Sequence, residues 1–177
     1  VLITGALLAQ VVINGPTTMV MGRWLPPFGI AFTVDILGAV LAFVAAVVAL
    51  ACTIYGVRDV NSSGRRYGFY SFFFLLMAGV SCAFLTGDIF NLYVWFEVML
   101  IASFGLMVLD ANKNQIDGAV KYVILNLIST LFFLLAIGLL YGVTGTLNLA
   151  DLHAKAALIP SDTKTLLAGF FLFAFLR

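Results

Sequence analysis

Long apolar runs alternate with short polar segments along the whole chain of 177 residues. The main runs hold about 20 residues or more, the length that an α-helix needs to cross the hydrocarbon core of a bilayer. They cover 30–57, 67–85, 89–109 and 118–141, and shorter apolar stretches cover 1–13 and 166–177. Segments of about ten residues with alternating polarity, typical of membrane β-barrels, do not occur. The pattern predicts an all-α, polytopic membrane helix bundle that forms a single transmembrane domain over residues 1–177.

The two terminal runs are too short to cross a bilayer. Residues 1–13 are apolar but lack an initiator Met and the positively charged region that begins a signal peptide. Residues 166–176 would rise only about 16 Å as a helix, about half of the bilayer core. We therefore expect the chain to be an interior fragment of a larger protein, with a partial span at each end.

The polar segments predict the connections between these helices. Residues 17–29 include Pro26 and Pro27, which exclude a regular helix there. The longest connection, 142–165, contains a stretch at 148–157 with the pattern of a short amphipathic helix, and Asn148 is its predicted N-cap.

The loop charges predict an orientation. Because successive loops alternate between the two membrane sides, segments 58–66 and 110–117 share one side and carry four Lys and Arg residues. The loops on the opposite side, around Arg23 and around Lys155 and Lys164, carry three. The positive-inside rule therefore assigns the 58–66 side to the cytoplasm.

The composition agrees with a membrane protein and excludes several other classes. The chain is 63% hydrophobic and 10% charged, with a mean hydropathy of +1.15, whereas soluble domains carry about 25% charged residues. A net charge of +1 offers no basic surface for nucleic acid. Cys52 and Cys82 lie inside apolar runs and behave as small hydrophobes, and His153 alone cannot build a metal site, so we expect neither a metal nor a cofactor.

Glu97 is the only glutamate of the chain, and it lies in the middle of the apolar run 89–109. A charged side chain at the centre of a bilayer costs roughly 2.5–3.5 kcal/mol on insertion scales. Such a residue is kept when it pairs with a buried cation, faces internal water or changes protonation state during function. Glu97 is therefore the first candidate for a proton-relay residue, and the alternative is a carboxylate that pairs with a neighbouring helix for packing alone.

Two aspartates lie near helix starts. Asp88 belongs to the predicted turn 86–88, nine residues before Glu97, so on one helix the two carboxylates would point to opposite sides and form no catalytic pair. Its position favours an N-cap, with a place on an ion-entry path as the alternative. Asp35 is the acid of the second span, and its place near the membrane edge favours a structural role.

The fifth span carries one basic residue and a polar stripe. Lys121 is either a lysine that extends to the membrane interface or a charge of an intramembrane proton relay. Polar residues follow it at helical spacing on one face: Tyr122, Asn126, Ser129 and Thr130. Such a stripe usually supplies hydrogen bonds between helices, and the alternative is the lining of a water-filled path.

Several motifs resemble the D-type subunit of Mrp-type multisubunit Na⁺/H⁺ antiporters, which shares a superfamily with subunits of complex I and membrane-bound hydrogenases. The strongest is the stretch Thr-Gly-Asp-Ile-Phe-Asn-Leu-Tyr-Val-Trp-Phe-Glu-Val at 86–98. The segments 23–30, 121–126 and 140–148 continue the similarity in the same order, so that it covers nearly the whole chain.

The resemblance implies a bundle of about fourteen helices with two inverted repeats of five and a broken helix in each repeat. This chain would supply the end of the second helix through the start of the seventh. In the family, the glutamate that Glu97 matches pairs with a lysine of the broken seventh helix. This chain reads Ala-Phe-Leu-Arg at 174–177 where the family reads roughly Ala-Phe-Gly-Ile-Lys. Either that lysine lies beyond Arg177, as we expect, or Arg177 replaces it and, because an arginine keeps its proton, makes a poor relay.

The resemblance implies a transporter subunit and not an enzyme. The expected function is proton and cation translocation in a multisubunit Na⁺ (or K⁺)/H⁺ antiporter, with other subunits of the complex as partners and the plasma membrane of a prokaryote as its location. One alternative is an antiporter-like, proton-pumping subunit of a redox-driven complex, such as a membrane-bound hydrogenase or complex I. The other is a structural scaffold subunit whose charges serve packing alone.

Overall fold

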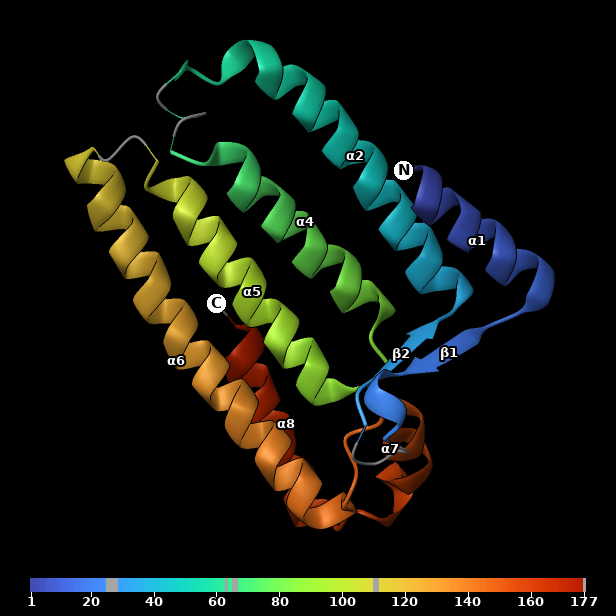
Figure 1. The fold of residues 1–177 in the computed structure, drawn as a ribbon. Coiled ribbons are helices and arrows are strands. Elements are labelled where there is room, and N and C mark those ends of the chain that lie inside the picture. The colour runs from blue at the N-terminus through green and yellow to red at the C-terminus, as the bar shows by residue number, and fades with distance from the viewer. Residues whose placement is uncertain (25–28, 63, 65–66, 110–111, 177) are drawn as a thin grey trace.

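The computed structural model describes residues 1–24, 29–62, 64, 67–109 and 112–176. It is a bundle of antiparallel helices with a short two-stranded sheet at one end (Figure 1). The predicted loop residues Pro26, Pro27, Arg65, Arg66 and Asp110, together with Arg177, lie outside the described residues.

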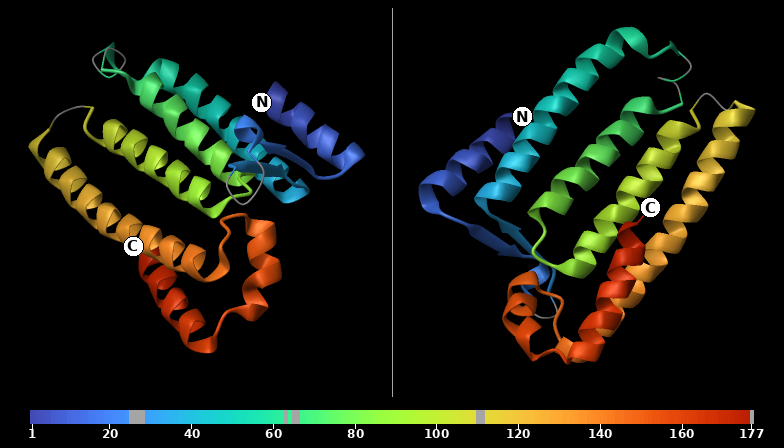
Figure 2. Two further views of the ribbon diagram at one scale, coloured as in Figure 1. Left: turned by 60° about the horizontal axis from the view of Figure 1, so that its bottom comes forward. Right: turned by 180° about the vertical axis from the view of Figure 1, so that it is seen from behind.

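The helices follow one another in a row. The elements in chain order are α1 (Leu2–Asn14), β1 (Thr17–Val20), a 3₁₀ turn (Met21–Arg23), β2 (Ala31–Val34), α2 (Ile36–Asp59), α4 (Phe69–Leu85), α5 (Ile89–Met107), α6 (Lys113–Thr144), α7 (Leu149–Lys155), a second 3₁₀ turn (Ala156–Leu158) and α8 (Ser161–Phe175). Neighbours in the row pack together from α1 to α6, and α8 packs against α6 (Figure 2).

Within the described part of the chain, α2, α5 and α6 are long and apolar enough to cross a membrane, whereas the apolar helices α1 and α4 are shorter. The turns after α2 and α5 lie at the same end of the bundle, and the sheet and α7 lie at the other (Figure 1). Many large apolar side chains point outward, as expected for helices that face lipid or further protein. The all-helical membrane bundle predicted from the apolar runs is therefore the observed architecture.

The helices approach one another closely because small residues lie at their contacts. Buried alanines occupy the packed faces of α2, α5 and α6, at Ala39, Ala42, Ala102, Ala119 and Ala136. In α5, a Cβ atom added at Gly105 would lie 2.5 Å from the Phe72 ring of α4. Small residues that allow such approach are the usual packing device of membrane helices.

One prediction near the N-terminus is wrong in detail. The second apolar run does not become helical at residue 30, because Ala31–Val34 pairs with Thr17–Val20 as an antiparallel hairpin. The helix begins at Ile36, where the Asp35 carboxylate accepts a hydrogen bond from the Gly38 amide at 2.7 Å and caps it. Residues 17–29, predicted as a loop, therefore include the first strand of this hairpin.

Local capping also sets the bounds of α6 wider than the predicted 118–141. The helix begins at Lys113 because Asn112 and Gln115 form a capping box, each side chain accepting a hydrogen bond from the other residue's backbone. It ends at Thr144, since Gly145 adopts a left-handed conformation with φ of 68° that glycine tolerates. The resulting helix has 32 residues, so it extends beyond the bilayer core.

Candidate functional site

Glu97 lies in the middle of α5, in a stretch of that helix whose neighbouring side chains contact α6 and α8. Its carboxylate is half-buried and interacts with the Tyr93 side chain, one turn earlier. Among the described residues it forms no ion pair. Acidic side chains inside membrane helices usually pair with a cation, face a cavity or line an ion path, so the surroundings of Glu97 decide what it can do.

Aromatic rings surround this part of α5. The Phe133 ring of α6 lies 6.0 Å from the Tyr93 ring and 5.9 Å from the Phe96 ring. The Phe175 ring of α8 lies 5.5 Å from Phe133 and 6.4 Å from Phe96. These rings make the surroundings of this part of α5 apolar, and charges interact more strongly in apolar surroundings than in water.

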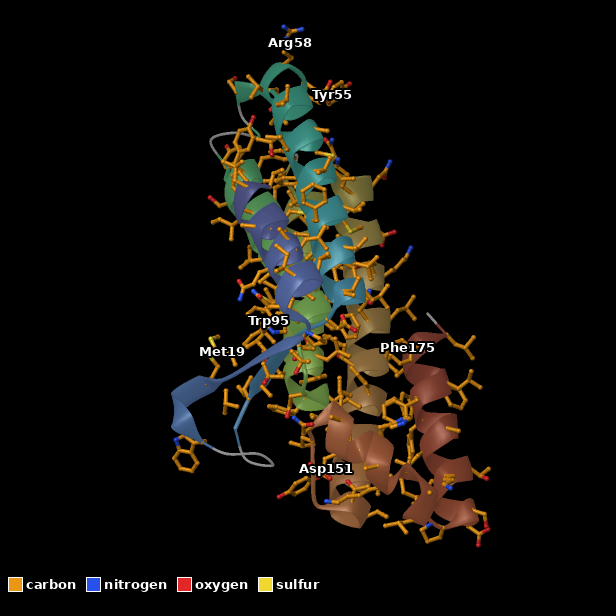
Figure 3. The ribbon with its side chains drawn as sticks, turned by 90° about the vertical axis from the view of Figure 1, so that its right-hand side faces the viewer. Met19, Tyr55, Arg58, Trp95, Asp151 and Phe175 are labelled. Carbon is orange, nitrogen blue, oxygen red and sulfur yellow. The ribbon has the colours of Figure 1, made fainter. Side chains whose placement is uncertain are left out.

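The last turn of α8 lies at the level of the middle of α5. Figure 3 shows Phe175 at about the level of Trp95 of α5, nearer to Asp151 at one end of the bundle than to Arg58 at the other. The backbone leaves helical geometry at Leu176. The residue next to Glu97, Phe96, therefore contacts α8 at the point where that helix ends.

Lys121 lies away from Glu97, on the outer surface of α6. Its ammonium group forms an ion pair with the Asp117 carboxylate at 2.6 Å, and the two side chains are 70% and 65% exposed. A pair four residues apart on a helix surface is a local contact within one helix. This geometry supports the interface interpretation of Lys121 over a relay position.

Asp88 is a buried N-cap, as its position before α5 predicts. Its carboxylate accepts a hydrogen bond from the Asn91 amide at 2.8 Å, and its side chain is almost fully buried. Burial raises the pKa of this carboxyl, while hydrogen bonds from the amides of Asn91 and Phe90 oppose that rise. The Asn91 side chain in turn donates to the Thr86 hydroxyl at 2.8 Å, so the cap belongs to a small buried network.

The segment 86–88 does more than turn the chain between α4 and α5. The Gly87 amide donates to the Ala31 carbonyl of β2 at 2.8 Å, and the Gly87 carbonyl accepts from the Leu149 amide at 2.9 Å. The Ile89 amide donates to the Leu147 carbonyl at 3.0 Å. These hydrogen bonds join the hairpin, the start of α5 and the start of α7 at one end of the bundle.

The polar stripe of α6 is buried at three positions, Asn126, Ser129 and Thr130. Their side chains donate to carbonyls of their own helix: Asn126 to Tyr122 at 2.7 Å, Ser129 to Leu125 at 3.1 Å and Thr130 to Leu127 at 3.1 Å. The expected bond between helices comes instead from Tyr122, whose hydroxyl lies 3.1 Å from the Ser103 hydroxyl of α5. The stripe therefore combines hydrogen bonds within α6 with a bond from Tyr122 to α5.

Comparison with known proteins shows the family of this chain. Residues 86–177 match the family model described as NADH:quinone oxidoreductase/Mrp antiporter, transmembrane. This match begins at Thr86, at the buried cap network, and covers more than half of the chain.

The chain belongs to this family.

Individual relatives agree with this assignment. The D-type Na⁺/H⁺ antiporter subunit of Alkalihalophilus pseudofirmus is 43% identical over 142 residues, which make up 80% of this chain and 29% of that protein. The chain superimposes on an archaeal membrane-bound sulfane sulfur reductase with a TM-score of 0.91 and 30% identity, covering 98% of this chain and 36% of that one. For the Mrp complex from Dietzia sp. DQ12-45-1b, the TM-score is 0.78 and the identity 29%, with coverages of 98% and 34%.

The chain thus spans about a third of the length of these relatives. It is a homologue of the D-type subunit of Mrp antiporters in a family shared with complex I, and the resemblance carried by the motif at 86–98 is confirmed.

Sequence reasoning missed one polar residue of this family member. Ser103 is the only polar residue between Glu97 and Asp110 in the sequence. That isolation is the signal that could have marked it, because a single hydroxyl in an apolar helix tends to find a partner on a neighbouring helix. Its partner, Tyr122, was recognised only as part of the α6 stripe.

Proposed function

We propose that this chain is part of a proton- and cation-translocating subunit of an Mrp-type Na⁺ (or K⁺)/H⁺ antiporter, in which Glu97 takes up and releases the transported proton. The observation that carries the proposal is the position of Glu97: it is a half-buried acidic residue in the middle of an apolar helix, and its neighbour Phe96 packs against aromatic rings of α6 and α8. The bacterial Na⁺/H⁺ antiporter subunits among its relatives support it.

The proton step requires a cation near Glu97. A carboxylate in apolar surroundings favours its protonated form, and an adjacent ammonium group favours the charged form. A lysine that follows α8 would come near Glu97, because Phe96 contacts Phe175 in the last turn of that helix. Movement of such a lysine toward or away from Glu97 would release or bind the proton.

The wider assignment follows from the relatives. The partners of this chain would be the other subunits of the complex, the transported ions would be H⁺ and Na⁺ or K⁺, and the location would be a prokaryotic plasma membrane. The relatives include a bacterial Na⁺/H⁺ antiporter subunit and a probable K⁺/H⁺ antiporter subunit. Because these relatives differ in the cation, the proposal includes both Na⁺ and K⁺.

A second candidate function rests on one specific observation. The superposition on the archaeal sulfane sulfur reductase has a higher TM-score than that on the Mrp complex, 0.91 against 0.78. In a redox-driven complex the proton chemistry at Glu97 would be the same, and electron transfer in another subunit would supply the energy.

The two candidates are separated by purification of the full-length protein from its native membrane. Small antiporter subunits in the complex, together with Na⁺- or K⁺-driven proton movement in proteoliposomes, would support the antiporter. Iron–sulfur or nickel–iron subunits would support the redox-driven pump instead. A complex that moves no protons under either driving force would leave this chain as a scaffold and contradict the proposal.

A further inference from the structure

A pocket of about 380 Å³ lies at the hairpin end of the bundle, where β2, the start of α2, the end of α4 and the start of α7 meet (Figure 1). Glu97 does not line it, because that residue lies in the middle of α5. The wall includes two glycines, Gly38 of α2 and Gly87 of the turn before α5. It also includes three residues that carry oxygen atoms next to these glycines, Thr33, Asp35 and Phe84.

The two glycines leave space beside these oxygen atoms. A Cβ atom added at Gly38 would lie 2.5 Å from the Phe84 carbonyl oxygen and 3.0 Å from Oδ1 of Asp35. One point beside α2 is therefore within about 3 Å of a carboxylate oxygen and of a carbonyl oxygen of α4. A Cβ atom added at Gly87 would clash with the Thr33 hydroxyl. A larger residue at either glycine would fill space next to the oxygens, so the glycines keep the pocket open to a ligand.

The oxygen atoms of the pocket can still bind a ligand. The Asp35 carboxylate accepts a hydrogen bond from the Gly38 amide at 2.7 Å and forms no ion pair with a described residue. The Thr33 hydroxyl and the carbonyls of Ala83 and Phe84, in the last turn of α4, form no hydrogen bond within the described part of the chain. A carboxylate has about four lone-pair sites and a carbonyl has two, so each keeps free acceptor capacity.

The charges around the pocket leave one negative unit. The N-terminal end of α2 and the C-terminal end of α4 carry partial charges of about half an elementary charge, positive and negative respectively, so they offset each other. The Asp35 carboxylate remains, and no lysine or arginine of the described residues lines the pocket. One negative charge beside neutral oxygen ligands matches a monovalent cation, whereas Ca²⁺ binds about six to eight oxygens, typically with more than one carboxylate.

We propose that this pocket binds one monovalent alkali cation, Na⁺ or K⁺. The Asp35 carboxylate supplies the charge, and the Thr33 hydroxyl and the carbonyls at the end of α4 supply neutral ligands. Free backbone carbonyls and the C-terminal ends of helices are common Na⁺ ligands in membrane transporters. The pocket volume of about 380 Å³ is many times the roughly 30 Å³ of a water molecule, so waters complete the shell of the ion.

The binding of the cation does not depend on the proposed function, but its role rests on it. In an antiporter, a site at this end of the bundle is where the transported cation enters or leaves the protein. Such a site sets the cation concentration that transport requires and takes no part in the proton transfer at Glu97. The two residues should therefore affect different quantities, the half-maximal cation concentration for Asp35 and the maximal rate for Glu97.

Cation binding is tested by chemical modification of carboxyl groups in the complete complex. A water-soluble carbodiimide with glycine ethyl ester converts an accessible carboxyl into an amide, and mass spectrometry measures the modified fraction at each residue. The reaction is run in NaCl, KCl or choline chloride at equal ionic strength. Asp59, an exposed acid at the other end of α2, is the matched control within the same helix.

A bound cation should protect Asp35 alone. At a Na⁺ or K⁺ concentration about ten times the dissociation constant, mass action predicts a reaction about ten-fold slower than in choline, and Asp59 should react equally in all three salts. Equal rates at Asp35 in the three salts would overturn the proposal. Full protection of Asp35 in choline as well would show that a cationic group of the complex occupies the pocket, and would overturn it too.

The Thr33 hydroxyl is tested by Thr33→Val, which keeps a branched side chain and removes one ligand. We expect the cation concentration for half-protection of Asp35 to rise about five-fold, the effect of one net hydrogen bond. Thr18→Val is the matched control, because Thr18 pairs with Thr33 across the hairpin and does not line the pocket. An unchanged half-protection concentration in Thr33→Val would contradict a ligand role for this hydroxyl.

The role in transport is tested by Asp35→Asn. Asparagine is an equally good N-cap, so this change keeps the start of α2 and removes the charge. We expect the Na⁺ or K⁺ concentration for half-maximal proton movement to rise about ten-fold, since a unit charge a few ångströms from the ion contributes at least this order of affinity near a protein surface. A lower maximal rate at an unchanged half-maximal concentration would show a structural role instead and would overturn the transport role of the pocket.

Failure of the proposed function gives a different result. Full activity of Glu97→Gln together with cation protection of Asp35 would reject the function and keep the cation site. Loss of activity in Glu97→Gln together with equal modification of Asp35 in all three salts would keep the function and reject the site.

Discussion

The Phe96 ring of α5 lies 6.4 Å from the Phe175 ring of α8, nearly edge to face. The two residues are far apart in the sequence, so this contact brings the middle of one helix to the end of another. Glu97 follows Phe96 directly, so α8 ends at the level of Glu97 along α5. This single contact links the acidic residue of α5 to the place where the family's lysine is expected.

An alanine should have opposite effects at two glycines, because Gly105 lies at the close contact of α4 and α5 and Gly138 of α6 faces open space. Gly105→Ala would bring a methyl group 2.5 Å from the Phe72 ring, and such overpacking costs typically about 1–3 kcal/mol. A Cβ at Gly138 meets no atom within 4 Å, so Gly138→Ala should gain helix stability of up to about 1 kcal/mol.

Thermal unfolding of the purified full-length protein in detergent measures both changes. We expect a lower Tm for Gly105→Ala and an equal or higher Tm for Gly138→Ala. A higher Tm for Gly105→Ala would show that α4 and α5 are not in close contact there.

The buried cap at Asp88 predicts that shape matters more than charge at this position. Asp88→Ala removes the acceptor of the Asn91 amide and should cost about 1–2 kcal/mol of stability. Asn is an equally good N-cap, and Asp88→Asn also removes a carboxylate whose burial raises its pKa, so its stability should be equal or higher. Thermal unfolding and proton movement should be measured on both variants, because a full loss of transport in a stable Asp88→Asn would favour the ion-entry role.

The contact between α7 and α6 predicts a loss of stability in acid. Lys155 bonds the Asp151 carboxylate at 2.9 Å and the Thr144 carbonyl at the end of α6 at 3.3 Å. Hydrogen bonds from Lys155 and Thr146 lower the pKa of Asp151. Since its pKa is lower in the folded protein than in the unfolded one, Asp151 stabilises the fold fully above its ordinary pKa, near 3.9, and this contribution disappears as the pH falls below about 4.

The measurement is Tm as a function of pH for the natural protein and for Lys155→Met. The natural protein should lose more stability than Lys155→Met between about pH 5 and pH 3, because the variant lacks the main cause of the lowered pKa. Parallel curves would show that the Asp151–Lys155 contact contributes nothing to the fold.

The exposed position of Lys121 predicts that its charge is dispensable for transport. An exposed pair four residues apart contributes only about 0.3–0.5 kcal/mol, and the pair with Asp117 faces outward. Lys121→Gln should therefore leave stability and proton movement within about two-fold of the natural protein. A loss of transport as large as that of Glu97→Gln would return Lys121 to the relay.

The helices and their caps could be predicted from local sequence, and the contacts between them could not. Apolar runs of bilayer length indicate the membrane helices, and Asp88 and Asn148 were predicted as N-caps because the capping residue acts within its own helix start. Both predictions are confirmed. The hairpin was not predicted because strands of four residues are too short to show an alternating pattern. Their pairing also depends on a contact between Thr17–Val20 and Ala31–Val34, which neither segment indicates alone.

The surroundings of the site depend on residues that are distant in sequence. Ser103 and Tyr122 come from two helices, and nothing in either segment alone indicates that their hydroxyls meet. Lys121 illustrates the converse, because a basic residue in the fifth apolar span suggested a relay while the helix turns its side chain outward. Each residue along an α-helix adds a rotation of about 100°, so one of two sequence neighbours can face the inside of the bundle while the other faces outward.

Ion-driven proton movement by Glu97→Gln is the decisive measurement of the role of Glu97 in proton transfer. The full-length variant is assembled with its partner subunits in inverted membrane vesicles, and the amount of complex is matched to that of the natural protein. Glutamine keeps the size of the side chain and removes its titratable group. We expect proton movement to fall to the background of vesicles without the complex, whereas proton movement at the natural rate would contradict a proton-transfer role for Glu97.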